Sequence, residues 1–169
     1  MDRRTSAASP GAGPADEQAA ALIAALAGRG ETVAAAESLT AGLVCATLAR
    51  VPGASAALRG GLVVYATELK TALAGVDAAL LAEHGAVHPE VAAQLAEGAR
   101  DRCGATWGLG LTGVAGPSAQ DGVEPGTVHV GLAGPGTRTV RTLALSGDRD
   151  LIRTESVLVA FALLGEHLA

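Results

Sequence analysis

Aromatic side chains are almost absent from this chain of 169 residues, which has one tryptophan, one tyrosine and one phenylalanine. Asparagine is missing altogether, and the formal net charge is −5. Proteins that bind nucleic acid usually combine a basic surface with aromatic side chains that stack on bases. Because the chain has neither feature, we expect no nucleic-acid partner.

Long apolar runs and metal-ligand clusters are also missing. No run reaches the roughly 20 apolar residues that span a bilayer, so we expect no membrane partner. Residues 1–15 lack the hydrophobic segment of a signal peptide, and we expect them to form a disordered lead-in of a cytoplasmic protein. Cys45 and Cys103 are isolated and the four histidines are scattered. We therefore expect two small buried thiols, no metal site and no cofactor.

Small residues are what the chain has in abundance, with 38 alanines and 23 glycines. Apolar residues make up 49% of the sequence, which is enough for a layered core with closely packed backbones. Charged residues make up only 17%, so the surface should be weakly charged. A surface of this kind favours association, and we expect a homo-oligomer, a dimer or larger.

Apolar periodicity predicts alternating helices and strands. The predicted helices cover residues 16–28, 40–50, from 67 to a stop at 75, 77–84, 89–102 and 148–168. The predicted strands cover residues 32–36, 62–66, 105–112, 127–133 and 138–146. This order predicts one domain over residues 16–169, a three-layer α/β/α sandwich with a mixed, mostly parallel sheet that has one antiparallel member. In the last helix we expect a buried side made by Leu151, Ile152, Leu158, Val159 and Ala162.

The single lysine, Lys70, follows the single tyrosine, Tyr65, by five positions, whereas the other eleven basic residues are arginine. Arginine keeps its proton near neutral pH, but a lysine in an apolar pocket can lose it. Lys70 is therefore either a solvated surface charge or an amine that acts as a base. Tyr65 is either a proton relay beside it or a half-buried residue at a strand end.

Two further segments have the character of a site. Ser38 and Thr40 lie where a predicted strand runs into a helix, so they either cap that helix or place a hydroxyl for chemistry. A serine paired with a lysine is a known form of activated nucleophile. Residues 108–113 fit G-x-G-x-x-G by letter, but these glycines fall inside a predicted strand, which favours a loop that approaches a ligand with its backbone. Arg149 and Arg153 share one helix face and could pair with phosphate or with carboxylates.

Seven ordered motifs together resemble the C-terminal domain of CinA, the competence/damage-inducible protein, a domain that also occurs as a free-standing nicotinamide-nucleotide amidohydrolase. The similarity covers about residues 17–165. The motifs are Ala36-Glu37-Ser38-x-Thr40-x-Gly42, Val51-Pro52-Gly53-x-Ser55, Gly60-Gly61-x-x-x-Tyr65-x-x-x-x-Lys70, Gly85-Ala86-Val87, Leu111-Thr112-Gly113-Val114-Ala115-Gly116-Pro117, Pro125-Gly126-Thr127-Val128 and Gly147-Asp148-Arg149-x-x-Ile152-Arg153.

The resemblance implies an α/β/α fold and hydrolysis of nicotinamide mononucleotide to nicotinic acid mononucleotide and ammonia, without a metal. It implies that Ser38 is the nucleophile, that Lys70 takes the serine proton and that Tyr65 orients or relays it. The nucleotide would bind at Glu37, Thr40, Gly42, Thr112, Gly113, Ala115 and Gly116. Arg149 or Arg153 would offset the negative net charge at the phosphate, and N–H groups at the helix start after Ser38 would face the amide oxygen.

Five features depart from the family pattern: Leu39 in place of a cysteine, Ala41 in place of a glycine, Thr67 in place of an asparagine, His88 in place of a serine, and residues 118–122 in place of a Gly-Gly pair. The substrate is therefore less firmly indicated than hydrolase chemistry. Two alternatives stay open, a non-catalytic nucleotide-binding or regulatory module and a hydrolase of a different small amide.

Overall fold

A computed structural model of the protein describes residues 13–169. Most of the expected lead-in, residues 1–15, lies outside the described residues. The first helix begins at Pro14, two residues before the predicted start. Proline fits the first turn of a helix, and the Asp16 carboxylate accepts a hydrogen bond from the Gly13 N–H group at 3.2 Å.

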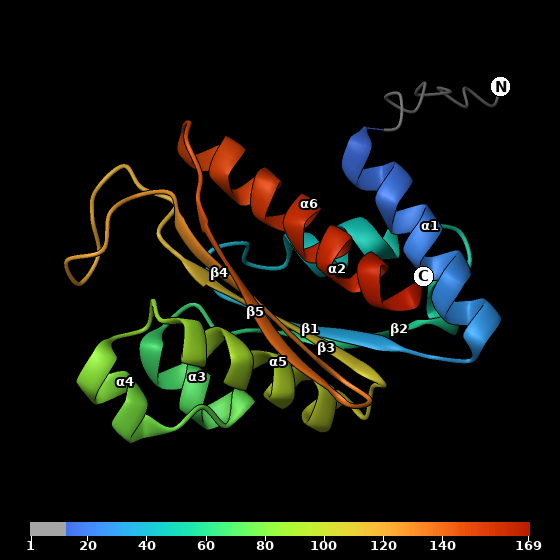
Figure 1. The fold of residues 1–169 in the computed structure, drawn as a ribbon, viewed down its shortest axis with the longest axis horizontal. Helices are drawn as coiled ribbons and strands as arrows, with labels where there is room; N and C mark the ends of the chain where they lie inside the picture. Colours follow the sequence, from blue (N-terminus) through green and yellow to red (C-terminus); the bar gives the residue numbers. More distant parts are fainter. Residues whose placement is uncertain (1–12) are drawn as a thin grey trace, which may run out of the picture.

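Five strands form one mixed sheet in the order β2-β1-β3-β4-β5 (Figure 1). β1 is parallel to β2 and β3, whereas β4 is antiparallel to β3 and to β5. Four strands therefore run in one direction and β4 runs against them, as predicted. The elements are α1 Pro14–Arg29, β1 Val33–Glu37, α2 Leu43–Ala49, a 3₁₀ turn at Ala54–Ala56, β2 Leu58–Val63, α3 Thr67–Ala74, α4 Ala78–His84, α5 Pro89–Cys103, β3 Trp107–Gly113, β4 Thr127–Gly134, β5 Thr137–Ala144 and α6 Arg149–Leu168.

Helices cover both faces of the sheet (Figure 1). Val33 and Ala35 of β1 point into a core with α1, α2 and α6, whereas Ala34 and Ala36 point into a core with α3, α4 and α5. This alternation along one strand produces the predicted three-layer α/β/α sandwich. Within residues 13–169 no helix is both long and apolar enough to cross a membrane.

Three local predictions differ from the structure. β2 spans Leu58–Val63, not residues 62–66, because two glycines hide the start of the strand from a periodicity search. α2 begins at Leu43, and the turn before it occupies the first predicted helical positions. Both cysteines are free, but each is only partly buried.

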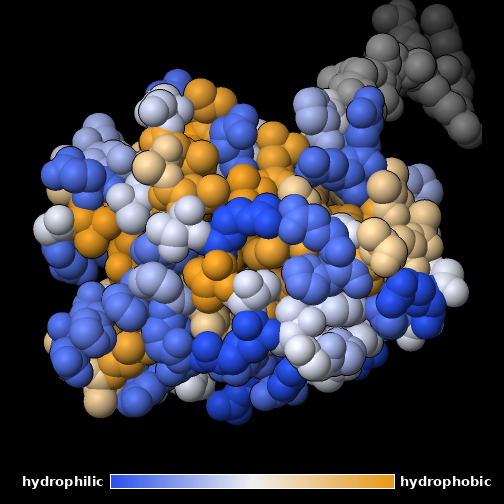
Figure 2. Space-filling view, viewed as in Figure 1, coloured by the Kyte–Doolittle hydropathy of each residue, from blue (hydrophilic) through white to orange (hydrophobic). Residues whose placement is uncertain are grey.

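The buried face of α6 also differs from the prediction. Its fully packed residues include Ile152, Val157, Phe161 and Leu164. Leu151 is 46% exposed, and Leu158, Val159 and Ala162 are only partly buried. These residues leave apolar surface along the helix, and Figure 2 shows hydrophobic residues gathered there. The expected homo-oligomer stays a prediction.

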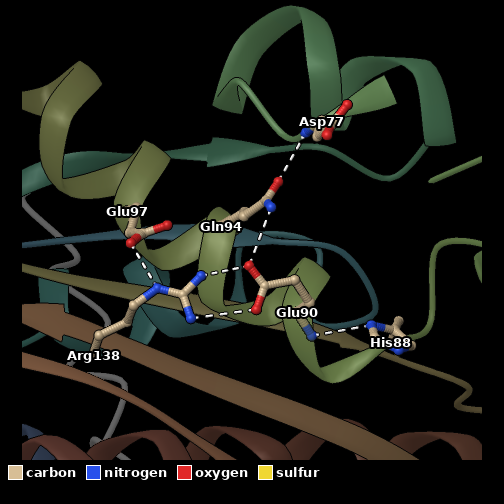
Figure 3. A network of polar contacts seen from close by, with 6 residues as sticks. All are labelled: Asp77, His88, Glu90, Gln94, Glu97 and Arg138. Carbon is tan, nitrogen blue, oxygen red and sulfur yellow. Dashed lines mark hydrogen bonds and ion pairs between the residues drawn. The ribbon is translucent and has the colours of Figure 1, made fainter. Parts of the chain in front are cut away.

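A polar network joins α5 to its neighbours (Figure 3). Arg138 of β5 pairs with Glu97 at 2.8 Å and with Glu90, and its hydrogen bonds lower the pKa of the Glu90 carboxyl. Gln94 donates to Glu90 and accepts from the Asp77 N–H group. The network connects α5 to β5 and to the start of α4.

Glycines let α5 approach the sheet closely. A Cβ atom at Gly110 of β3 or at Gly131 of β4 would collide with the Ala92 carbonyl oxygen of α5. The G-x-G spacing of residues 108–110 therefore serves helix–sheet packing and not a nucleotide.

We expect Gly110→Ala to lower the free energy of unfolding by about 3 kcal/mol, because the added methyl group overpacks this contact. Gly28→Ala is the matched control, since Gly28 lies in α1 with open space around its Cβ position. It should raise stability by about 0.5–1 kcal/mol through helix propensity. Equal effects of the two substitutions in urea denaturation would contradict this packing.

Candidate active site

A cavity of about 330 Å³ lies beyond the ends of the neighbouring strands β1 and β3. Open α/β sheets bind ligands at this edge. Its wall contains serine, threonine, tyrosine and arginine side chains beside loops of glycine and alanine that expose their backbone. The lining residues are Ser38, Leu39, Tyr65, Ala86, Val87, Thr112, Gly113, Val114, Ala115, Gly116, Ser118, Ala119, Gln120 and Arg149.

Strand register brings the predicted serine and lysine together. Glu37, the last residue of β1, pairs with Val63, the last residue of β2, so Ser38 and Val64 leave the sheet side by side. α3 begins at Thr67 and turns Lys70 back toward them. Lys70 Nζ lies 3.1 Å from Ser38 Oγ, 2.8 Å from the Val64 carbonyl oxygen and 3.3 Å from the Tyr65 carbonyl oxygen.

The Lys70 amine is buried, with a side chain that is 1% exposed. Burial removes the solvation of the charged form and lowers the pKa of Lys70 to about 8, although Glu68 acts in the opposite direction. Two carbonyl oxygens can accept both hydrogens of a neutral amine, which leaves the nitrogen lone pair directed at Ser38. This arrangement can remove a proton from the serine hydroxyl.

Tyr65 lies at the mouth of the cavity and is 55% exposed. Its contact with Lys70 is through the main-chain carbonyl and not the phenol. The phenol oxygen instead accepts a hydrogen bond of 2.8 Å from Arg149, whose guanidinium also donates to the Gly116 carbonyl at 2.8 Å. Arg149 of α6 thus bonds to Tyr65 on one side of the cavity opening and to Gly116 on the other.

Four other predicted binding residues line the cavity: Thr112, Gly113, Ala115 and Gly116. The Thr112 hydroxyl donates to the Ala86 carbonyl at 2.6 Å and holds two segments of the wall together. Val114 and Gly126 are joined by a hydrogen bond of 2.7 Å, which fixes the base of the following loop.

Glu37, which we expected to contact the nucleotide, does not line the cavity. Its carboxylate is buried and accepts hydrogen bonds from the N–H groups of Gly42, Val44 and Cys45 at 3.0 to 3.1 Å. These groups belong to the start of α2, so the helix start cannot offer them to a substrate as expected. Glu37 caps α2, and Gly42 belongs to this cap.

Thr40 and Arg153 also lie outside the cavity wall. Arg153 Nε donates to the Leu39 carbonyl at 2.9 Å, and its Nη2 donates to the Thr40 carbonyl at 3.1 Å. The guanidinium therefore binds the backbone of the turn after Ser38 and not the cavity.

Sequence reasoning did not select Leu39, Ala86, Val87 and Val114 as binding residues, although they lie within the motif pattern and line the cavity. Among the departures from that pattern, Ala41 is exposed and His88 caps α5 by accepting from the Glu90 N–H group. Neither of them lines the cavity, and nor does Thr67. Leu39 does line it, and so does the altered loop through Ser118, Ala119 and Gln120.

Comparison with known proteins identifies the family of the chain. The family model described as the CinA C-terminal domain matches residues 15–168. The chain belongs to the CinA C-terminal domain family. This finding confirms the predicted family.

Curated CinA-like proteins resemble this CinA C-terminal domain across most of its length. The protein of Frankia casuarinae is 52% identical over 141 residues, which are 83% of this chain and 33% of that protein. A relative from an Anaeromyxobacter species is 52% identical over 90% of this chain and 38% of its own length. The chain thus spans little more than a third of these relatives.

Solved structures match the CinA C-terminal domain as a whole. A competence/damage-inducible protein from Agrobacterium tumefaciens superposes with a TM-score of 0.88 at 30% identity, covering 93% of this chain and 97% of that one. A CinA superfamily protein from Klebsiella pneumoniae gives 0.87 at 30% identity, over 91% and 97% of the two chains. These matches confirm the predicted α/β fold.

The turn after Ser38 in this CinA C-terminal domain is strained at Ala41, whose φ of 48° is in the left-handed region. We expect Ala41→Gly to raise the free energy of unfolding by up to about 1 kcal/mol, because glycine adopts this conformation freely. Ala46→Gly, in the exposed middle of α2, should lower it by about 1 kcal/mol. Urea titrations compare the two, and a loss of stability in both variants would contradict the strain.

Proposed function

We propose that this protein is an amidohydrolase that converts nicotinamide mononucleotide to nicotinic acid mononucleotide and ammonia, with Ser38 as nucleophile and Lys70 as base. The main support is the 3.1 Å contact between Ser38 Oγ and a buried lysine whose pKa is lowered to about 8. A solvated lysine would hold its proton at neutral pH and could not activate a serine.

The first half of the reaction would form an acyl-enzyme. Ser38 Oγ attacks the carboxamide carbon while the serine proton passes to the neutral Lys70 amine, and the carbonyl electron pair moves to the oxygen. The tetrahedral intermediate collapses as the carbon–nitrogen bond breaks. Lys70 returns the proton to the leaving nitrogen, which departs as ammonia.

The second half would use water as the nucleophile. Lys70 takes a proton from a water molecule as its oxygen attacks the ester carbon. The carbon–Ser38 bond then breaks, and Lys70 returns the proton to the serine oxygen. The products are the free carboxylic acid and the original enzyme.

The cavity has properties suited to a small polar nucleotide. Its volume of about 330 Å³ falls in the range of small-molecule pockets. Arg149 lies in its wall and carries the positive charge that a phosphate requires. The loop of Ala115 and Gly116 presents backbone, which can approach a ligand closely.

The direct test is ammonia release from nicotinamide mononucleotide. We expect Ser38→Ala to reduce turnover to background. Lys70→Arg keeps the positive charge, but a guanidinium does not lose its proton near neutral pH and cannot act as a base. We therefore expect it to lower kcat by at least about 100-fold. Lys70→Met, which suits the buried position better than arginine, should lower it as much.

Thermal melting with and without the nucleotide separates loss of chemistry from loss of binding. We expect the nucleotide to raise the Tm of the wild type and of Ser38→Ala. A wild-type protein that the nucleotide stabilises but that releases no ammonia would contradict hydrolysis and favour the non-catalytic binding module. Turnover of other small amides but not of this nucleotide would assign a different substrate.

A further inference from the structure

One guanidinium determines the shape of the turn that follows Ser38. Arg153 of α6 lies across this turn and donates to two successive carbonyl oxygens, those of Leu39 and Thr40. The next amide, that of Ala41, donates to the Ser38 carbonyl at 3.0 Å. All three carbonyl groups of the turn are therefore held by hydrogen bonds.

Held carbonyls also fix the directions of the N–H groups. The only cis peptide bond among residues 13–169 is Gly116–Pro117, so the bonds of this turn are trans. In a trans peptide the N–H group points opposite to the carbonyl of the same plane. The Leu39 carbonyl bound by Arg153 thus orients the Thr40 N–H group. The Thr40 carbonyl orients Ala41 N–H, whose bond to Ser38 orients Leu39 N–H.

The two N–H groups immediately after the nucleophile are the ones without a partner. Neither Leu39 N–H nor Thr40 N–H makes a hydrogen bond within residues 13–169. The N–H groups of Gly42 and Val44, further along the chain, donate to the Glu37 carboxylate. The Thr40 hydroxyl is buried without a partner in the same part of the chain. Unpaired polar groups and a strained residue, Ala41, are typical of a functional turn.

We propose that the N–H group of Leu39, a residue of the cavity wall, binds the oxyanion that forms when Ser38 attacks. Arg153 is the positioning residue that orients this amide, through the Thr40 carbonyl and the bond between Ala41 N–H and the Ser38 carbonyl. This inference rests on the proposed acyl transfer at Ser38. The negative charge develops on the carbonyl oxygen bound to the attacked carbon, within reach of the amide that directly follows the nucleophile. Arg153 acts through the backbone and does not contact the substrate.

The assignment separates Arg153 from Arg149, which lie four residues apart on α6. Arg149 lines the cavity and can meet a phosphate, whereas Arg153 uses Nε and Nη2 on the turn outside the cavity wall. A side chain that binds the phosphate stabilises the ground state and the transition state alike, whereas a donor to the oxyanion stabilises only the transition state. The two arginines should therefore affect different kinetic constants.

The kinetic test compares Arg153→Met with Arg149→Met on nicotinamide mononucleotide and on nicotinamide riboside, which lacks the phosphate. Arg153→Met should lower kcat at least about tenfold on both substrates with little change in KM. Arg149→Met should raise KM for the mononucleotide alone. A selective rise in KM for the mononucleotide in Arg153→Met would overturn the proposal and make Arg153 a phosphate ligand.

Labelling of Ser38 by a fluorophosphonate tests the turn without relying on the substrate. Ser38 Oγ forms a bond to phosphorus, fluoride leaves, and the serine proton passes to Lys70. Arg153→Met should be labelled at least about tenfold more slowly than the wild type, and Arg153→Lys, which can hold one carbonyl, should lie between them. The Tm of each variant shows that the protein is folded.

The two assays distinguish the two proposals. In one outcome the wild type labels well but releases no ammonia from nicotinamide mononucleotide, while both Arg153 variants label slowly. This result supports the role of Arg153 and rejects nicotinamide mononucleotide as the substrate. Labelling at the wild-type rate in Arg153→Lys would overturn the positioning role, even if Arg153→Met does not fold.

Discussion

The Lys70 amine has to find acceptors for its hydrogens inside the protein, because its side chain is almost fully shielded from water. The ends of β1 and β2 meet this requirement. Their parallel register leaves Ser38 and Val64 adjacent, and the return of the chain into α3 brings the amine between the Val64 and Tyr65 carbonyls and the serine oxygen. Shielding from water lowers the pKa of Lys70, and the two carbonyl acceptors set the direction of the lone pair on its nitrogen. The same contact therefore explains both the position of α3 and the chemistry proposed for Ser38.

The turn between Ser38 and α2 is ordered by charges on opposite sides. Glu37 binds the amides that open α2, and Arg153 binds the carbonyls of the turn itself. Together they keep Ala41 in a conformation that alanine avoids. Because Glu37 accepts hydrogen bonds from the amides that open α2, the activation proposed for Ser38 relies on Lys70 and not on the α2 dipole. Glu37 and Arg153 therefore hold the backbone next to Ser38 in place and do not line the cavity themselves.

Much of the fold and part of the site could be predicted from the sequence. Apolar periodicity and the Gly75 stop indicated most elements, and the rarity of lysine among the arginines drew attention to Lys70, which the structure places beside Ser38. Periodicity failed at Gly60 and Gly61, which contribute no side chains to the pattern, and on α6, where Leu151 and Leu158 resemble core residues but are not fully buried. Motifs placed Glu37, Thr40 and Arg153 near the site, but a motif cannot show whether a side chain faces the cavity or the backbone behind it. That distinction depends on tertiary hydrogen bonds.

The central claim is that Lys70 titrates near neutrality in the folded protein. Because Lys70 is the single lysine, protein labelled with ¹³C and ¹⁵N lysine gives one side-chain amine signal, which can be followed by NMR as the pH is varied. Burial disfavours the charged form, so the predicted midpoint lies at about 8, and the neutral base accumulates as the pH rises through that value. A midpoint close to 10.5, the ordinary value for lysine, would mean that the amine keeps its proton at neutral pH and would contradict its role as the base for Ser38.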